Sequence, residues 1–300
     1  MSRIEIMCTS TGCIEYAPER YRNLGIDIIR IHIFFEGKEY LEGKGLDPVE
    51  FYKKLETLEN PKNNLPKTGI PSPLEIAAHF DKAIEEGYDE VIVYVISSGL
   101  GGTYNAISLV ARDYADRLKI HVVDTKITTF SEGYLAVHAQ KLVDEGKSAE
   151  EILKETAWMM KRQVFMGVDG KLDYLIYNGR LKGGKAFMGQ MLKICPVVHF
   201  DHNGDCVALE SVRTEKKALM RTCEILKDII GDRSPEDYLL WHVFTGPSLL
   251  ESLLPIEEKY GIKTNHEDII MSPVSGSHNG PWLAGYGLVF LRREDEPLED

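Results

Sequence analysis

Residues 91–106 read VIVYVISSGLGGTYNA, and this stretch decides the fold of the first half of the chain. The continuous apolar run at 91–96 predicts a strand buried on both faces, and the residues from Thr103 to about 115 predict a helix. Hydroxyl groups and glycines therefore join the carboxyl end of a strand to the N-terminus of a helix. Free backbone N–H groups and the helix dipole make such a junction receptive to an anion.

Strand-like and helix-like segments alternate on both sides of this stretch. Strands are predicted at 4–8, 28–35 and 120–123. Helices are predicted after Asp47 and after Ser72, where an acidic residue three positions later completes a capping box. This alternation predicts a largely parallel sheet covered on both faces by helices.

The alternation of strands and helices changes after Ser148, which caps a helix predicted to reach about 162. Strands then dominate, which predicts a second domain of α+β type. We expect an N-terminal α/β domain over 1–155, a C-terminal α+β domain over 156–293 and a charged tail at 294–300. The strands expected after the boundary are 163–168, 197–199, 207–212, 238–244, 268–271 and 286–292, and the helices are 186–194, 214–230 and 247–260.

Composition excludes several classes of protein. The net charge of −12, with no basic run to offset it, argues against a nucleic-acid-binding surface. No segment is apolar for long enough to span a membrane, and the charged N-terminus does not resemble a signal peptide. An odd number of widely spaced cysteines predicts free thiols in a cytoplasmic protein, without disulfides or a structural zinc site. These cysteines are Cys8, Cys13, Cys195, Cys206 and Cys223.

Three polar turns of the first domain are candidate binding loops. The segment 97–104 lacks the lysine of a phosphate loop and does not match G-x-G-x-x-G, so it is poorly suited to a nucleotide. Thr68–Ser72 and Thr9–Gly12 add further hydroxyl groups, and all three turns could lie along one edge of the sheet. The plainer interpretation is that they are ordinary helix entries, with Thr103 acting only as a cap.

The second domain supplies candidate cations. Arg180 lies in a glycine-bearing turn. His278 lies in a loop predicted at 275–281, among small residues that give no packing reason for an imidazole. A serine hydrolase using Ser98 and His278 remains an alternative. A phosphoryl-transfer enzyme using the loop at 97–102, which we call the glycine loop, is another. No G-x-S-x-G elbow and no HExxH motif is present, so no catalytic residue and no metal ligand is predicted.

The series of motifs resembles the DegV family of bacterial fatty-acid-binding proteins. Thr9–Gly12 is similar to the family's Asp-Ser-Thr-Ala turn, Thr68–Ser72 to its Thr-Ser-x-Pro-Ser loop, and Ser97–Tyr104 to its Ser-Ser-x-Leu-Ser-Gly-Thr-Tyr segment. Later matches occur, in the same order, at Leu175–Leu181, Lys193–Pro196, Val212–Thr214 and His278–Pro281.

The resemblance implies a two-domain protein that binds one long-chain fatty acid in the cleft between its domains, without a cofactor. It implies that Thr68 and Ser98 hydrogen-bond the carboxylate, and that Arg180 and His278 lie beside it. It also implies a partner, a fatty acid kinase that converts the bound ligand into an acyl phosphate. The protein itself is then not an enzyme. The secondary candidates in the ligand loops are Ser97, Gly101, Gly102, Thr103 and Trp282.

The chain departs from the family pattern at several positions. Thr9 and Cys13 replace acidic residues of the first turn, Gly101 replaces a serine, and Trp282 stands where a glycine is expected. These departures affect the choice of ligand, because Gly101 removes a hydroxyl group and Trp282 adds bulk. The basic cluster Arg213, Lys216 and Lys217 is either a solvated helix face or a docking surface for the kinase.

Overall fold

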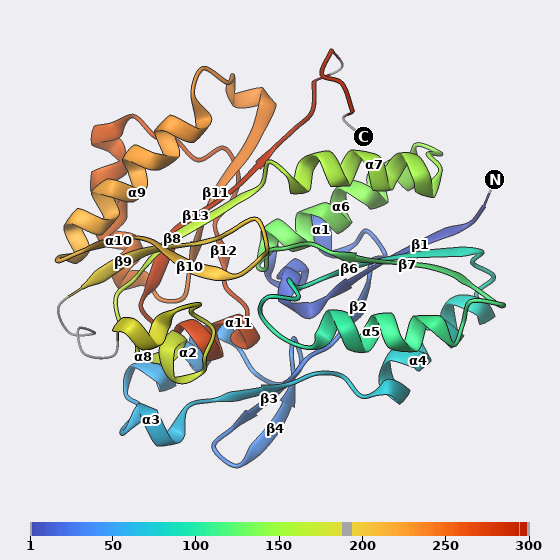
Figure 1. Cartoon of the computed structure of the whole chain (residues 1–300), viewed down its shortest axis with the longest axis horizontal. Helices are drawn as coiled ribbons and strands as arrows, with labels where there is room; N and C mark the ends of the chain where they lie inside the picture. The colour runs from blue at the N-terminus through green and yellow to red at the C-terminus, as the bar shows by residue number, and fades with distance from the viewer. Residues whose placement is uncertain (1, 188–193, 294, 299–300) are drawn as a thin grey trace.

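The first half of the chain builds a parallel sheet. The computed structural model describes residues 2–187, 194–293 and 295–298. Sheet A has the order β2-β1-β6-β7, and all of its strand pairs are parallel (Figure 1). This confirms the predicted parallel sheet. Its strands are β1 (Ile4–Thr9), β2 (Asp27–Ile29), β6 (Glu90–Val95) and β7 (Lys119–Asp124).

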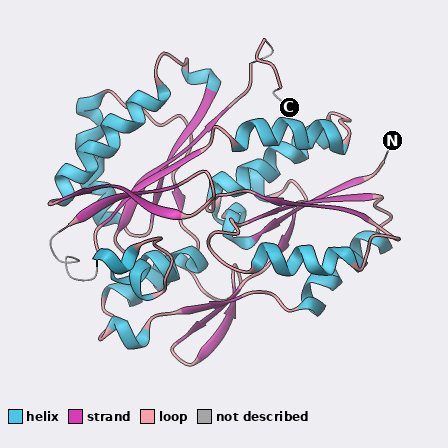
Figure 2. Cartoon of the chain, in the orientation of Figure 1, coloured by secondary structure: helices cyan, strands magenta, loops and turns pink. Residues whose placement is uncertain are grey.

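Helices cover both faces of sheet A, as Figure 2 shows. Alternate residues of each strand point to opposite faces, so Val91 and Val93 join one apolar core and Ile92 and Tyr94 join another. The first core is covered by α4 (Pro73–Glu85) and α5 (Thr103–Arg112). The second is covered by α6 (Phe130–Asp144) and α7 (Ala149–Met160).

The predicted helix caps are present. Ser72 and Ser148 each accept a hydrogen bond from the backbone of a glutamate three residues later, and that glutamate bonds back to the cap, so both capping boxes are confirmed. Asp47 caps α2 (Pro48–Glu56) in the same way, without the reciprocal bond. The sequence therefore determines where these helices begin.

The second half of the chain forms sheet C, with the order β10-β9-β8-β13-β11-β12. Its neighbours are antiparallel except for β11 and β12. Helices α9 (Glu215–Ile230) and α10 (Pro247–Tyr260) pack against it, and α6 reaches it through Phe130, whose ring centroid lies 5.4 Å from that of Trp241. The strands are β8 (Val164–Asp169), β9 (Cys195–Phe200), β10 (Cys206–Val212), β11 (Tyr238–Phe244), β12 (Ile269–Ile270) and β13 (Leu283–Phe290).

A third, antiparallel sheet was not predicted. Sheet B places β3 (His32–Phe35) between β4 (Lys38–Leu41) and β5 (Lys67–Gly69). The prediction of one strand over 28–35 was therefore wrong, because β2 ends at Ile29. The backbone N–H of Ile31 donates to Ser10 Oγ (3.1 Å) and its carbonyl accepts from Glu42, which turns the chain out of sheet A.

One further prediction differs from the structure, and another falls largely outside the described residues. The glycine- and serine-rich segment 275–281 was expected to be a loop, but most of it belongs to helix α11 (Pro273–Asn279), because Ser272 caps that helix and Pro273 opens it. The expected helix at 186–194 falls largely on 188–193, which lie outside the described residues. The remaining elements are η1 (Ser10–Gly12), η2 (Ile14–Tyr16), α1 (Glu19–Arg22), α3 (Pro61–Asn64), α8 (Asp173–Tyr177), η3 (Gly184–Phe187) and η4 (Pro235–Asp237).

An ionic cluster around the buried His242 ties α10 to sheet C. His242 on β11 contacts Asp268 through Nδ1 (2.7 Å) and Glu257 through Nε2 (2.8 Å), and Tyr286 donates to the same glutamate. Burial alone would lower the pKa of His242, but the carboxylates of Asp268 and Glu257 together raise this pKa to about 9. The folded protein therefore holds this imidazole as a cation.

The ionic cluster predicts a pH dependence of stability. A raised folded pKa gives His242 a stabilising effect that is complete below its unfolded pKa of about 6.5 and is lost as the pH rises through 9. We expect the contribution of His242 to the free energy of unfolding to fall by roughly 2 kcal/mol between pH 6.5 and pH 9. Urea denaturation of the wild type and of His242→Gln should show converging stabilities over this interval. A difference that stays constant would contradict the assignment.

Candidate functional site

The candidate site lies where the strands of sheet A end. Because these strands are parallel, the segments that follow β1, β6 and β7 meet at one edge of the sheet. Sheet B, α11 and the turn after α8 enclose a pocket of about 680 Å³ there, including the space open to solvent at its mouth. The residues that line it are Ile31, Thr68, Gly69, Ile70, Ile96, Leu100, Gly101, Gly102, Thr103, Thr128, Leu175, Arg180, Phe200, Cys206, Val274, Ser275, His278 and Asn279.

Thr68 and His278 form a hydrogen-bonded pair in the pocket. Thr68 Oγ1 on β5 lies 2.9 Å from Nε2 of His278 on α11, and Nδ1 of the same ring is buried and has no hydrogen-bond partner among the described residues. Burial, reinforced by the charge of Arg180, lowers the pKa of His278 to about 3. The imidazole is therefore neutral at physiological pH, with both the hydroxyl and the ring available to a polar ligand.

Arg180 brings a positive charge to the same pocket. It follows α8 in a turn that is tied to α11, since Asn178 Nδ2 donates to the carbonyl of Ser277 (3.0 Å) and Arg180 Nη1 donates to the carbonyl of Asn178 (2.8 Å). Burial lowers the pKa of Arg180, but a guanidinium stays protonated in proteins. Arg180 is thus a fixed cation in the lining of the pocket.

The glycine loop forms the wall opposite Arg180. Gly101, Gly102 and Thr103 line the pocket, and Leu100 adds an apolar side chain. A Cβ atom placed on Gly101 would lie 3.9 Å from Arg180 Nη2 and would contact nothing closer. The loop therefore leaves open space beside the cation.

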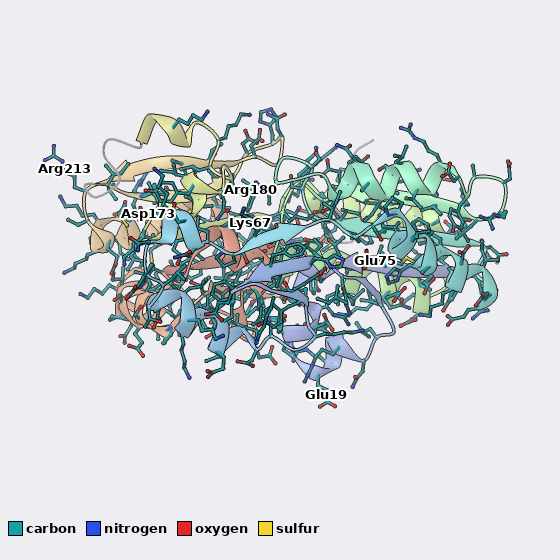
Figure 3. The ribbon with its side chains drawn as sticks, turned by 90° about the horizontal axis from the view of Figure 1, so that it is seen from below. Glu19, Lys67, Glu75, Asp173, Arg180 and Arg213 are labelled. Atoms are coloured by element: carbon teal, nitrogen blue, oxygen red, sulfur yellow. The ribbon has the colours of Figure 1, made fainter. Side chains whose placement is uncertain are left out.

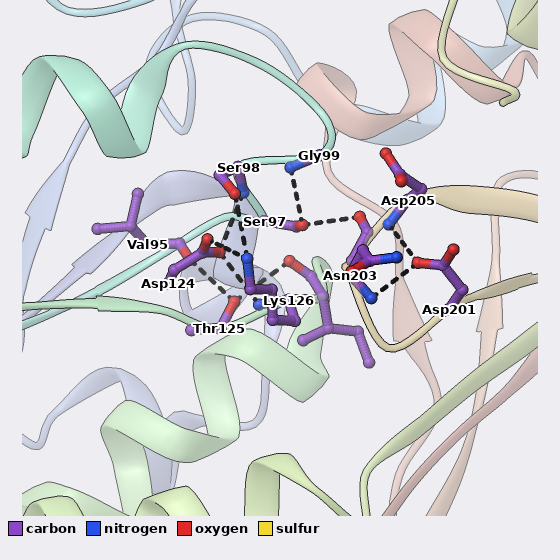
Figure 4. A network of polar contacts seen from close by, with 12 residues as sticks. Val95, Ser97, Ser98, Gly99, Asp124, Thr125, Lys126, Asp201, Asn203 and Asp205 are labelled. Atoms are coloured by element: carbon purple, nitrogen blue, oxygen red, sulfur yellow. Dashed lines mark hydrogen bonds and ion pairs between the residues drawn. The ribbon is translucent and has the colours of Figure 1, made fainter.

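Ser97 and Ser98 are not among the residues that line the pocket, and Figure 4 shows them in a polar network with Asp124 and Lys126. The Ser98 backbone N–H donates to Asp124 Oδ1 (3.0 Å), and its Oγ lies 3.3 Å from Lys126 Nζ. The fully buried Ser97 donates through Oγ to the carbonyl of Gly204 (2.7 Å), in the turn between β9 and β10. That turn needs a glycine, because Gly204 has φ +80° and a Cβ there would lie 2.1 Å from Ser97 Oγ.

The structure brings most of the predicted ligand residues together. Six of them line one pocket although they come from both halves of the chain: Thr68, Gly101, Gly102, Thr103, Arg180 and His278. Ser97, Ser98 and Trp282 are not part of this lining. The Trp282 ring packs instead against Lys171, whose Nζ lies 3.4 Å from the ring centroid, and against Tyr174.

Sequence reasoning missed the apolar wall of the pocket. Leu175 and Val274 come from helices, while Phe200 and Cys206 flank the turn between β9 and β10. The Asn203-Gly204 pair signals that hairpin turn, but nothing local indicates that the turn lies against the glycine loop. The pocket therefore combines an apolar wall with hydroxyl, imidazole and guanidinium groups, which suits an amphiphile with an anionic head.

Metal-binding clusters and membrane-spanning helices were looked for in the described part of the chain. Among residues 2–187, 194–293 and 295–298, no group of three or more His, Cys, Asp or Glu side chains could hold a metal ion. Within the same residues, no helix has the length and apolar character that crossing a bilayer requires.

Comparison with known proteins identifies the family of this chain. The sequence model described as "Uncharacterised protein, DegV family" matches residues 3–291. The chain belongs to the DegV family. A DegV domain-containing protein of Clostridium acetobutylicum is 30% identical over 289 residues, which cover 96% of this chain and 99% of that protein.

Solved structures of DegV proteins share the whole fold. The fatty-acid-binding DegV family protein of Streptococcus agalactiae is 29% identical, has a TM-score of 0.87, and is matched over 97% of this chain and 100% of its own. DegV of Bacillus subtilis, described as a fatty acid binding protein, is 28% identical with a TM-score of 0.79 over the same shares. The two-domain architecture that the sequence predicts is thus that of the family.

Proposed function

We propose that this protein binds one long-chain fatty acid, with the carboxylate beside Thr68, Arg180 and His278 and the acyl chain along the apolar wall. The observation that carries the proposal is the convergence of these three groups in one pocket, whose lining also includes the apolar side chains of Leu100, Leu175 and Phe200. DegV relatives whose descriptions state fatty acid binding support it. Titration of a delipidated sample with oleate tests it, since a saturable isotherm with one site is expected.

The acyl chain should supply most of the affinity. About fifteen methylenes at ~0.8 kcal/mol each contribute on the order of 12 kcal/mol before the costs of association. The head group then fixes the orientation of the ligand, because a carboxylate accepts hydrogen bonds from hydroxyl and guanidinium donors. A protein that binds in this way needs no catalytic base, so we propose that it is not itself an enzyme.

The geometry favours binding over hydrolysis. A serine hydrolase would pair Ser98 with a base, but His278 is hydrogen-bonded to Thr68. Lys126 lies near Ser98, yet its Nζ is ion-paired with Asp124 Oδ2 at 2.6 Å, which stabilises the protonated amine. Labelling of Ser98 by a fluorophosphonate probe would restore the hydrolase alternative, and ATP turnover by the chain alone would restore phosphoryl transfer.

Thr68 and Ser98 are expected to differ in their contributions. Thr68→Ala should weaken oleate binding by about 1–2 kcal/mol, roughly 5- to 30-fold, because it removes a hydroxyl donor from the pocket. Ser98→Ala should weaken binding less, because its hydroxyl lies beside Lys126. Calorimetric titration of both variants measures the difference. Equal losses would mean that Ser98 also bonds the carboxylate directly, as the family resemblance implies.

Gly101 offers a gain-of-affinity test. Gly101→Ser would place a hydroxyl group beside Arg180 Nη2 in open space, so we expect oleate to bind about 3- to 10-fold more tightly. Gly102→Ser is the matched control, since a Cβ there has only Ile70 Cδ1 near it, at 4.0 Å. A weaker Gly101→Ser complex would show that the ligand head already fills this space.

We also propose that the bound fatty acid is presented to a fatty acid kinase in the cytoplasm. The basic cluster Arg213, Lys216 and Lys217 is our candidate docking surface, because all three side chains are exposed. Figure 3 shows Arg213 at one end of the molecule, away from Arg180 near its middle. Reversing these three charges should therefore abolish acyl phosphate formation by the added kinase and leave oleate binding intact.

A further inference from the structure

A buried carboxyl group that has no role in the binding function described above supports the glycine loop indirectly. Glu132, in the first turn of α6, is fully buried. Thr9 Oγ1 donates to Glu132 Oε1 over a short contact, and Thr11 Oγ1 donates to Oε2 at 2.8 Å. Two hydroxyl groups from the end of β1 are thus held by one carboxyl group.

Thr9 also hydrogen-bonds the backbone at the start of the glycine loop. Its Oγ1 accepts a hydrogen bond from the backbone N–H of Ile96 (3.1 Å), which lines the pocket and immediately precedes Ser97. The Thr9 hydroxyl therefore donates its single proton to Glu132 and accepts the Ile96 N–H with a lone pair. Thr11 has no such contact with the strand that leads into the loop, since its hydroxyl meets only Glu132 and Thr9 among the contacts of the described residues.

Backbone packing places Glu132 at this position. The helix start lies directly on the turn after β1, because a Cβ on Gly133 would lie 2.0 Å from the carbonyl oxygen of Gly12. The residue before α6, Thr129, has φ 64° and ψ −162°, a conformation that is essentially restricted to glycine. Strain of this kind persists only where the surroundings enforce it, and the preceding residue, Thr128, lines the pocket.

We propose that Glu132 is a positioning residue of the ligand pocket, which acts through the Thr9 hydroxyl to hold the backbone of Ile96 and thereby the glycine loop at 97–102. The ligand in question is the fatty acid of the proposed function. Neither Glu132 nor Thr9 belongs to the lining of the pocket, so they act on its geometry only through the backbone of Ile96, which does line it.

Thr9 and Thr11 provide a matched pair of variants. Both are fully buried and both donate to Glu132, but only Thr9 also holds Ile96. Thr9→Val should raise the amide hydrogen-exchange rates of residues 96–102 about tenfold and weaken oleate binding by a similar factor. Thr11→Val should leave both quantities within about twofold of the wild type, since it removes a comparable bond to Glu132 but leaves the bond from Ile96 to Thr9 in place.

Hydrogen exchange separates this proposal from the binding function. If the wild type does not bind oleate, the function fails, but the difference in exchange between Thr9→Val and Thr11→Val still tests the relay. Thr9→Ser retains the hydroxyl and should behave as the wild type, so it serves if the valine variant does not fold. Equal exchange in the Thr9→Val and Thr11→Val proteins, or loosening in Thr9→Ser as large as in Thr9→Val, would overturn the proposal.

Discussion

Arg180→Met weakens the binding of a long-chain fatty acid by about 10- to 100-fold, on the scale of a hydrogen bond to a charged group. Arg180 is the one cation among the residues that line the described pocket, and the His278 imidazole beside it is neutral. The negative charge of the ligand would then face an apolar side chain. Calorimetric titration with oleate measures the loss.

Arg112→Met is the control for this substitution. Arg112 is exposed in the last turn of α5 and is not part of the pocket lining, so its replacement should leave the affinity unchanged. The methyl ester of oleate provides a second control, because it lacks the charge. If Arg180→Met loses as much affinity for the ester as for oleate, the arginine acts through packing and our assignment of the head group is wrong.

Leu100→Asp should abolish measurable binding, with a loss of at least about 100-fold. Leu100 lies between the hydroxyl-rich start of the loop and its glycines, and its side chain forms part of the apolar wall. A carboxylate there would have to be buried against the acyl chain, and it would also compete for Arg180. Displacement of a fluorescent fatty acid such as cis-parinaric acid measures the effect.

The partial exposure of Leu100 keeps this test interpretable. Its side chain is not fully buried, so the variant should fold, and the thermal midpoint can confirm this. Leu109→Asp is the matched control on the neighbouring helix, because Leu109 is 62% exposed and lies outside the pocket lining. Normal binding by Leu100→Asp would place the acyl chain elsewhere.

The parallel sheet and its helices could be predicted because their signals are local. Buried strands such as 91–96 are continuous apolar runs, and Ser72 and Ser148 mark helix starts with capping boxes. Sheet B could not be predicted, because the chain leaves sheet A at Ile31 through a hydrogen bond to Ser10, which is distant in sequence. The start of α11 was available in Ser272 and Pro273, but the glycine-rich composition after them suggested a loop.

Several polar groups of the candidate site were predicted, and its apolar groups were missed. His278 stood out because the small residues around it give no packing reason for an imidazole, whereas the roles of Thr68 and Arg180 came from the resemblance to the DegV motifs. Phe200 and Val274 are ordinary core residues by composition, and only the tertiary fold places them at the pocket. The side-chain direction of Ser98 could likewise not be predicted from the sequence, since it depends on Asp124 and Lys126 at the end of the neighbouring strand.

Native mass spectrometry of the protein as purified shows directly whether it carries a fatty acid. We expect a species heavier than the polypeptide by one long-chain fatty acid, which collisional activation releases as a carboxylate anion. Arg180→Met should carry less of this ligand than the wild type. A polypeptide that is free of ligand and stays free after incubation with oleate would contradict the account.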